Sequence, residues 1–578
     1  MSAASDRLSS GSPSASVLAR RALLSRLAAL GAGTATFRRA LADEAVKTGR
    51  LTAEQVSHAE WVAGLTLSEA DREVLRRSGE SLLGELQQLR SAKLEPAALS
   101  CLRFDPEIAD PQAREAARSP APWLVSPAAV PSPAALPAEV TDETLPWLPI
   151  RTLAALLRSG RLTSERLVQL SLSRLKSADP QLLCVVSLLE ESALAAARQA
   201  DAELKAGKDR GLLHGIPWGA KDLLAVAGTK TTWGAPQYRD RIIDQTATVA
   251  AKLSAAGAVL VAKLTTGALA MGDQWFGGKT RNPWNTEEGS SGSSAGSASA
   301  VSAGLVPFAI GSETLGSIVS PTRRCGVAGL RPTFGRISRG GCMPLSWSMD
   351  KLGPIARTAD DLGIVLAATH GADTLDPCSV DRWFAWPQTV DLGRLRVGRV
   401  TNAKAEPPEK AALEHLKALG ASIIDIELPR SESDDAITIM LEAEACEVFR
   451  ELSNAGTTEG LNAWPRIFQK ARFISAADYL HASRMRLQLM QKMAALFRTV
   501  DLYVGGDDLV ITNLTGHPSI ALPVILQEQQ PEPRAVCCTL TAGLYDEASL
   551  LATAALIESR ADVLKYHPSL KSVPQEKQ

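Results

Sequence analysis

From about residue 150 onward, short apolar runs alternate with segments of helical pattern, and this alternation constrains the fold more than any other feature of the chain. The runs are short enough to be buried strands, and the segments between them carry helix-forming residues. Strands that alternate with helices favour an α/β core with a largely parallel sheet. The predicted strands are 214–218, 258–262, 306–310, 395–400 and 423–426, and the predicted helices are 152–159, 164–175, 191–206, 246–256, 295–303 and 408–419.

Two regions precede this core. Residues 1–117 form the first region: 1–13 are Ser-rich and predicted to be disordered, and from about residue 17 to 117 the pattern is helical, with Thr52-x-x-Gln55 and Ser68-x-x-Asp71 typical of helix N-terminal capping boxes. They contain no recognisable chemistry and are predicted to be a helical appendage. Residues 118–149 contain eight prolines and are predicted to be an extended linker without a helix. The remaining domain is predicted to cover 150–570.

The first 42 residues allow two interpretations. Arg20-Arg21, the uncharged run 27–37 and Ala40-Leu-Ala42 together resemble a twin-arginine export signal with a cleavage site. Arg38 and Arg39 follow the apolar run, however, and fit an amphipathic helix with scattered arginines. We therefore expect a cytoplasmic protein, with export as the alternative.

Charge and cysteine content exclude several classes of protein. The 62 Lys and Arg balance 63 Asp and Glu, whereas nonspecific nucleic-acid binding needs a surplus of cations. No apolar stretch reaches the 18 or so residues of a membrane-spanning helix. The eight Cys form no Cys-x-x-Cys pair and the seven His are scattered, which argues against a disulfide scaffold or a zinc site. We expect no metal, no cofactor and no nucleic-acid partner, and the sequence leaves a homodimer open.

An unusual Gly/Ser stretch covers residues 289–297. By composition alone it would be a flexible linker. It is followed, however, by segments predicted to be a helix and a buried strand, and a flexible tether does not belong inside a packed α/β unit. Gly and Ser here are better explained by backbone amides that approach a reacting group closely.

A candidate nucleophile follows the predicted strand 306–310. In Gly311-Ser-Glu-Thr-Leu-Gly-Ser-Ile318, a serine stands at a glycine-flanked turn whose N–H groups could bind an oxyanion. The pattern is not Gly-x-Ser-x-Gly, so an ordinary α/β-hydrolase is not implied. No His is near in sequence, and the base could be Lys221. A lysine at a strand end is usually a solvated charge, but in a desolvated pocket its pKa can fall enough to leave a neutral amine.

These pieces, in this order and spacing, resemble the amidase signature family from about Pro149 to the C-terminal region. The resemblance implies the amidase-signature fold, an α/β fold with a central mixed, mostly parallel twisted sheet flanked by helices. The matching motifs are Thr163-Ser-Glu165, Gly215-Ile-Pro-Trp-Gly-Ala-Lys-Asp222, Arg281-Asn-Pro-Trp-Asn285, Gly292-Ser-Ser-Ala-Gly-Ser297, Gly326-Val-Ala-Gly-Leu-Arg-Pro-Thr333, Gly353-Pro-Ile-Ala-Arg357 and Asn513-Leu-Thr-Gly-His-Pro518.

The resemblance also implies a Ser–Ser–Lys triad. Ser317 matches the nucleophile, Ser293 the bridging serine that follows a cis peptide bond, and Lys221 the base. Neutral Lys221 would take a proton through Ser293 while Ser317 attacks the amide carbonyl, and water would hydrolyse the acyl-enzyme. Ser294 and Ser297 are expected to be structural.

Further positions follow from the same resemblance. The expected oxyanion hole consists of the backbone N–H groups of Thr314, Leu315, Gly316 and Ser317. Pocket walls are expected from 270–275 and from the helical stretch 437–473. The residues expected to bind substrate are Gly292, Ala270 and Met271.

The chain departs from the family pattern at two positions. Leu315 replaces the usual glycine, so its backbone must suit a non-glycine residue, and its side chain would narrow the pocket. Val319 replaces the arginine that usually follows the nucleophile by two residues, which removes an ion pair to the acidic position of Glu313. Arg323 or Arg324 is the expected compensating cation.

Three functions are compatible with these residues. The favoured one is a stand-alone amidase that acts on a small amide. The second is the glutaminase subunit of a tRNA-dependent amidotransferase, which resembles the chain over the same region but lacks a counterpart of the first 145 or so residues. The third is a non-catalytic binding protein on the same fold, against which the intact Lys221, Ser293 and Ser317 argue.

Overall fold

The computed structural model describes residues 136–570 except 431–433, 473 and 529–532, together with 102–110 and short pieces within 51–76 and 115–125. The chain divides into two compact units, 1–95 and 96–578. In the first unit the predicted capping box at Thr52 is confirmed, because Gln55 N–H donates to Thr52 Oγ1 at 3.2 Å and Thr52 N–H donates to Gln55 Oε1 at 2.7 Å. At Ser68 the Asp71 N–H donates to Ser68 Oγ at 3.2 Å, and Ser68 Oγ donates to the Asp71 carboxylate at 2.6 Å. The predicted disordered stretch 1–13 and the predicted twin-arginine segment within 1–42 lie outside the described residues.

The second unit begins at residue 96, so it takes in the end of the predicted appendage and the whole predicted linker. The 3-10 helix η1 (Pro106–Ala109) carries a buried Glu107 that pairs with Arg382 at 2.9 Å, and Phe104 packs edge-on against Phe334. In the proline-rich stretch, β1 (Leu124–Val125) pairs with β12 (Thr389–Val390), and η2 (Leu145–Trp147) buries Leu145. The predicted linker without a helix is therefore wrong at 145–147, where Pro146 occupies an early position of a 3-10 helix, a place at which proline is tolerated.

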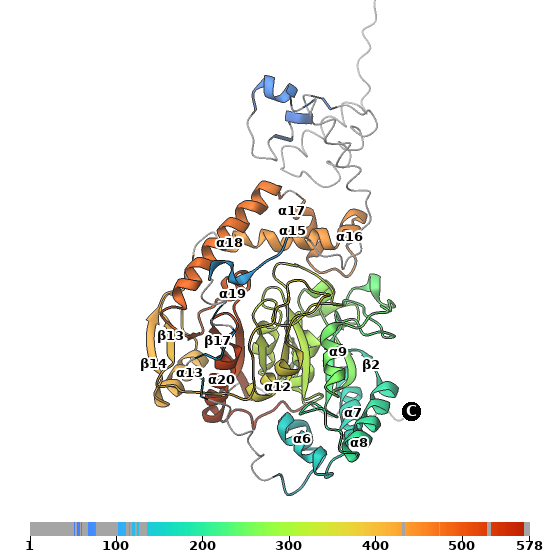
Figure 1. Ribbon diagram of the computed structural model, residues 1–578. Coiled ribbons are helices and arrows are strands. Elements are labelled where there is room, and N and C mark those ends of the chain that lie inside the picture. The colour runs from blue at the N-terminus through green and yellow to red at the C-terminus, as the bar shows by residue number, and fades with distance from the viewer. Residues whose placement is uncertain are drawn as a thin grey trace, which may run out of the picture. The chain divides into compact units, whose positions relative to one another are not determined.

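An eleven-stranded sheet forms the centre of the described part of this unit (Figure 1). In spatial order its strands are β14 (Ser422–Ile426), β13 (Arg396–Val400), β15 (Leu502–Val504), β17 (Arg534–Ala542), β16 (Ser519–Gln527), β10 (Ala328–Arg331), β11 (Lys351–Ala356), β9 (Phe308–Glu313), β3 (Pro217–Lys221), β4 (Val259–Leu264) and β2 (Val185–Leu188).

Both kinds of strand pairing occur, so the predicted mixed α/β sheet is confirmed. Parallel pairing, which the alternation of strands and helices predicts, lies at the two wings, where β3 pairs with β4 and β9, and β13 with β14 and β15. The strands between the wings pair antiparallel, as in β16–β17 and β9–β11. Shorter strands lie outside this sheet and are β5 (Gln274–Trp275), β6 (Gly278–Lys279), β7 (Arg281–Asn282) and β8 (Asn285–Gly289).

Helices cover both faces of the sheet, and apolar residues of the strands point to both sides. On β9, Phe308 and Ile310 belong to one hydrophobic cluster, and Ala309 between them belongs to another. The helices are α6 (Ile150–Arg158), α7 (Ser164–Leu182), α8 (Glu190–Lys205), α9 (Thr248–Ala255), α10 (Ala295–Ser302), α11 (Val319–Cys325), α12 (Ala359–Thr369), α13 (Pro407–Ala418), α14 (Asp434–Ile437), α15 (Ile439–Val448), α16 (Arg450–Ala455), α17 (Trp464–Ala471), α18 (Ala476–Leu496), α19 (Leu509–Thr515) and α20 (Glu547–Ala561).

Helices α15 to α18 gather at one end of this unit, away from α6, α7 and α8 (Figure 1). The predicted helices lie close to observed ones, but the strand predicted at 214–218 begins later, at Pro217. Gly215 has a φ of +80°, and its N–H donates to Gly257, so the chain is still turning there. The strand then continues beyond its predicted end at residue 218, so that Lys221 is its last residue. Among the described residues, no helix is both long and apolar enough to cross a membrane.

Candidate active site

The last residue of β3, Lys221, extends into a cluster of hydroxyl groups. Its Nζ lies 2.8 Å from Ser293 Oγ, 2.9 Å from Ser312 Oγ and 3.1 Å from Ser294 Oγ, and 3.3 Å from the Ser312 carbonyl oxygen. All these neighbours are uncharged. The side chain of Lys221 is fully buried. The predicted proximity of Lys221 and Ser293 is thus present in the structure.

Burial strongly favours the neutral form of this amine. It lowers the pKa of Lys221 well below its ordinary value, and the negative charges of Glu313 and Asp350 oppose this shift only in part. The carboxylate next in sequence, Asp222, does not reach Lys221. Adjacent side chains of a strand point to opposite faces, and Asp222 pairs with Lys263 at 2.8 Å instead.

The Gly/Ser stretch lies against the ends of β3 and β9. The Gly292–Ser293 peptide bond is cis, as the family resemblance implies, and α10 begins two residues later. Ser294 Oγ donates to the Ser312 carbonyl at 3.1 Å, and Ser297 Oγ to the Ile310 carbonyl at 3.3 Å. These two hydroxyls hold α10 onto β9, which fits the structural role expected of them.

The turn that contains the candidate nucleophile leads from β9 into α11. Ser317 is partly buried, and its carbonyl accepts the Ser294 N–H at 3.0 Å, which joins this turn to the serine stretch. Gly316 has a φ of +84°, a backbone conformation that favours glycine. Among the backbone hydrogen bonds found outside helices and strands in the described residues, none uses the N–H groups of 314–317 as donors. The oxyanion hole expected from these groups stays a prediction.

The backbone conformation at Leu315 explains how the chain tolerates the first of the two departures from the family pattern. Its φ is not positive, so the turn accepts a side chain at this position without backbone strain. The side chain is 36% exposed, unusually high for a leucine beside a buried site.

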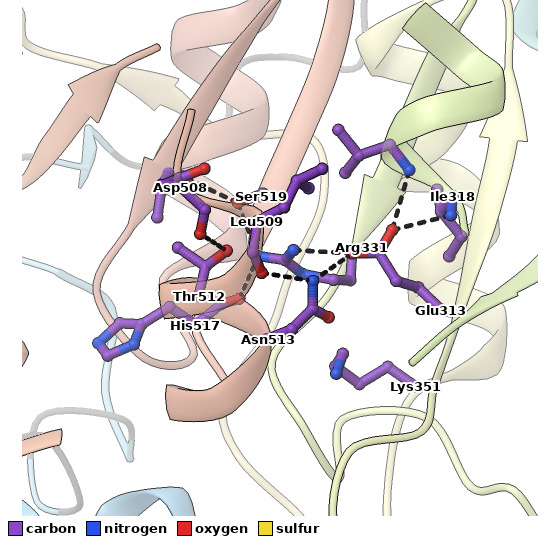
Figure 2. Close-up of polar contacts among 12 residues, drawn as sticks. Glu313, Ile318, Arg331, Lys351, Asp508, Leu509, Thr512, Asn513, His517 and Ser519 are labelled. Carbon is purple, nitrogen blue, oxygen red and sulfur yellow. Dashed lines mark hydrogen bonds and ion pairs between the residues drawn. The ribbon is translucent and has the colours of Figure 1, made fainter. Parts of the chain in front are cut away.

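The second departure is compensated by a residue that the sequence did not indicate. Arg331, the last residue of β10, donates to Glu313 Oε1 at 2.8 Å, and both side chains are fully buried (Figure 2). The prediction that Arg323 or Arg324 takes this place was wrong, because Arg324 pairs with Glu288 at 3.1 Å and the Glu313 contacts are filled by Arg331 and Asn513. Arg331 ends β10, which is separated from β9 by β11, so this contact cannot be found from sequence distance.

The loop that contains Leu269, Ala270 and Gly272 packs against the Gly/Ser stretch at Gly292. At Gly292, an added Cβ would lie 2.0 Å from the Gly272 carbonyl oxygen, so the two backbones touch. Leu269 and Ala270 adopt left-handed backbone conformations. Two side chains at the start of α17 and just before it hold this loop. Asn462 Nδ2 donates to the Met271 carbonyl at 2.9 Å, and Trp464 Nε1 donates to the Leu269 carbonyl at 3.1 Å.

A cavity lies beside these elements. Its lining includes Ala270, Ser312, Thr314, Asp350 and Lys351. Ala270 therefore faces the same cavity as the hydroxyl partner of Lys221, whereas Met271 packs against the hydrophobic core. Thr314 Oγ1 donates to Asp350 Oδ1 at 2.6 Å, and burial raises the pKa of Asp350.

Sequence reasoning missed three residues of this site. Ser312 contacts Lys221 through both its hydroxyl and its carbonyl, and Arg331 and Asn513 hold Glu313. The signal for Ser312 was available, since it directly precedes Glu313 in the predicted turn. Arg331 and Asn513 stand inside matched motifs, but nothing in those motifs indicated which side chain they contact.

The chain is similar to known proteins in three respects. A family model for Amidase matches residues 166–505. A glutamyl-tRNA(Gln) amidotransferase subunit of Coxiella burnetii is 30% identical over 476 residues, which cover 72% of this chain and 98% of the relative. The native peptide amidase of Stenotrophomonas maltophilia is 28% identical with a TM-score of 0.63, over 72% of this chain and 96% of that structure.

Together the fold and these matches define an enzyme, a hydrolase that acts on amide C–N bonds. The chain belongs to the Amidase family, also called the amidase signature family.

Proposed function

We propose that this protein hydrolyses the amide bond of a small molecule through a Ser–Ser–Lys triad formed by Ser317, Ser293 and Lys221. The observation that carries the proposal is the environment of Lys221. It is a fully buried amine, 2.8 Å from Ser293 Oγ, with a pKa well below its ordinary value because of burial. A lysine in this state can accept a proton at moderate pH.

The reaction begins with proton transfer. Ser293 gives its hydroxyl proton to neutral Lys221 and takes the proton of Ser317, whose Oγ then bonds to the amide carbonyl carbon. The negative charge on the carbonyl oxygen is held by backbone N–H groups of 314–317. As the C–N bond breaks, the proton returns from Lys221 through Ser293 to the leaving nitrogen, which departs as ammonia or an amine.

Water completes the cycle. It attacks the ester carbon of the acyl-enzyme and gives one proton through Ser293 to Lys221. That proton returns to Ser317 Oγ as the ester C–O bond breaks, and the carboxylic acid that leaves loses its own proton to solvent and becomes a carboxylate. The substrate would lie between the Leu315 turn and the loop that holds Ala270 and Met271, with the Gly292 backbone beside it. We retain a cytoplasmic protein without nucleic-acid partners as part of this proposal, and a homodimer as an open expectation.

A second function has specific support from the relatives. Several curated relatives are named as subunits of glutamyl-tRNA(Gln) amidotransferase, and this chain covers nearly their whole length. In that case glutamine would be the amide, and partner chains would receive the ammonia. Ammonia release that depends on partner chains and charged tRNA would favour this function over a stand-alone amidase.

The deciding experiment identifies the nucleophile and the activity together. A panel of simple amides is tested for product, and a sulfonyl fluoride probe is used to label the native protein, followed by mass spectrometry. We expect adduct on Ser317 and only background hydrolysis by Ser317→Ala with folding intact. Labelling of Ser294 instead would overturn the assignment, and labelling without product on any amide would favour a non-catalytic binding protein.

A further inference from the structure

The carboxylate of Glu313 is completely occupied by hydrogen-bond donors. Its Oε2 accepts the N–H groups of Ile318 and Val319 at 2.8 and 2.9 Å. Its Oε1 accepts Arg331 Nη1 and Asn513 Nδ2, both at 2.8 Å (Figure 2). Four donors fill the four lone-pair positions of a carboxylate, so Glu313 has no free site for accepting a substrate proton.

The donors on Oε2 belong to the turn of the nucleophile. Ile318 and Val319 directly follow Ser317, and Val319 is the first residue of α11. The N-cap of α11 has no side-chain hydrogen bond of its own, so Glu313 supplies the acceptor that the first helical N–H groups require. The direction in which the chain leaves Ser317 therefore depends on where Oε2 lies.

The donors on Oε1 come from outside this turn and are themselves fixed. Arg331 Nη2 donates to the His517 carbonyl at 3.0 Å and to Ser519 Oγ at 2.8 Å. Asn513 Nδ2 also donates to the Leu509 carbonyl at 2.9 Å, one turn back along α19. Glu313 is thereby tied to β10, β16 and α19, three elements that do not contain the predicted triad.

We propose that Arg331 and Asn513 are positioning residues for the nucleophile, because they orient the Glu313 carboxylate that holds the backbone immediately after Ser317. This inference rests on the function proposed above for Ser317. In this chain Arg331 would supply the ion pair to Glu313 that an arginine at position 319 would otherwise supply.

The charge state of the cluster supports this role. Burial acts to raise the pKa of Glu313, but the charge of Arg331 and the hydrogen bonds from Arg331, Val319 and Asn513 outweigh it and lower the pKa to about 2. Glu313 therefore stays an anion over the working pH range. An anion holds N–H donors more strongly than a neutral acid would.

Arginine is required at this position by geometry as well as by charge. Two nitrogens of one planar guanidinium reach Glu313 on one side and His517 and Ser519 on the other. A lysine ammonium is a single point and cannot span both. Arg331→Lys should thus keep the buried charge while releasing the carboxylate from its fixed orientation.

A second buried ion pair in the same unit provides a matched control. Arg336 and Glu547 are also fully buried, 2.5 Å apart, and Glu547 Oε1 accepts the Thr333 N–H at 2.8 Å. This pair holds backbone after β10 but not the turn of Ser317. Arg336→Lys makes the same chemical change in a pair of the same kind, so it measures the purely structural cost.

The test compares Arg331→Lys, Asn513→Ala and Arg336→Lys in the full chain. The readouts are kcat, KM and the rate of sulfonyl fluoride labelling at Ser317, each per folded molecule. We expect Arg331→Lys to lower kcat and the labelling rate about 10²-fold with KM nearly unchanged, since a small misplacement of a reacting group has an effect of this size. Asn513→Ala should lower both about tenfold, and Arg336→Lys should change neither.

Equal labelling rates in Arg331→Lys, Arg336→Lys and the wild type would overturn the proposal. If Arg331→Lys fails to fold, Asn513→Ala decides, because it removes one neutral donor and leaves the ion pair intact. An unchanged labelling rate in folded Asn513→Ala would then reject the positioning role. Wild-type protein labelled somewhere other than Ser317 would instead show that the proposed function itself is wrong.

Discussion

Two lysines on neighbouring strands show how the same residue type takes different roles in one sheet. Lys221 ends β3 and Lys263 lies near the end of β4, and both side chains are fully buried. Lys263 is registered with Ala220, so it faces the side of the sheet opposite to Lys221. Its Nζ lies 2.8 Å from Asp222 Oδ1, whereas Lys221 contacts only hydroxyls and a carbonyl.

The two lysines differ in whether a neighbouring carboxylate compensates for the burial of the amine. Burial lowers the pKa of both amines, but the charge of Asp222 and its hydrogen bond favour the protonated form of Lys263. Lys221 has no carboxylate in contact, and its pKa falls well below the ordinary value. Lys263 thus remains one half of an ion pair, while Lys221 is held as an available base. The contrast predicts that the two positions respond in opposite ways to substitution.

The largest effect is expected for activity at Lys221. Lys221→Met and Lys221→Arg should each lower kcat/KM by at least about 10²-fold, because general-base catalysis typically contributes 10²–10⁴ and arginine cannot deprotonate. The measurement is a steady-state assay on the best amide substrate, with circular dichroism to establish folding. Retention of more than about a tenth of the activity by Lys221→Met would remove Lys221 from the mechanism.

The next effect concerns stability and should appear at Lys263. Lys263→Met leaves Asp222 buried and unpaired, which typically costs about 3–5 kcal/mol. Lys221→Met removes an uncompensated buried amine and should leave the free energy of unfolding unchanged or raise it. Urea unfolding of the two variants at neutral pH measures both values. The comparison fails if the two variants are destabilised equally.

The pH dependence gives a third contrast. The neutral fraction of Lys221 increases with pH, so acylation should rise and then level off, with a midpoint below 10.5. Six groups contact this amine or act on it electrostatically, namely the hydroxyls of Ser293, Ser294 and Ser312, the Ser312 carbonyl, and the carboxylates of Glu313 and Asp350.

The free energy of unfolding should also depend on the protonation of Lys221. Between the folded pKa of Lys221 and 10.5 the unfolded chain binds more protons than the folded one, so the free energy of unfolding rises with pH in this window. The slope should be smaller in Lys221→Met. Unfolding at a series of pH values measures it, and an identical slope in the variant would contradict a depressed pKa.

The smallest effect is expected when one of the uncharged hydroxyl groups that contact the two lysines is removed. Ser294→Ala removes one hydroxyl 3.1 Å from Lys221, and one hydrogen bond is worth about 1 kcal/mol, or roughly fivefold in rate. Thr231→Val removes the hydroxyl 3.1 Å from Lys263 and is the matched control. Only Ser294→Ala should change kcat/KM. A loss as large as that of Lys221→Met would make Ser294, not Ser293, the link to the base.

The sequence by itself was sufficient for the α/β class, for five of the strands of the large sheet and for the helices next to them, but it did not predict β2, β10, β11, β15, β16 or β17. Helices and strands follow from local patterns, such as the capping of α7 by Thr163 and the apolar run of β9, and these depend on neighbours a few residues away. The positions of Lys221, Ser293 and Ser317 were also available, because their motifs resemble a known family.

Only the tertiary structure decided how these residues are paired. In the folded chain Glu313 pairs with Arg331 rather than with Arg323 or Arg324. Asp222 pairs with Lys263 rather than with Lys221. Such contacts join strands that are far apart in the chain, and their strength depends on burial, which removes the competing water. A buried charge must find a partner wherever the fold places one, so its partner is a property of the packed sheet and not of the local sequence.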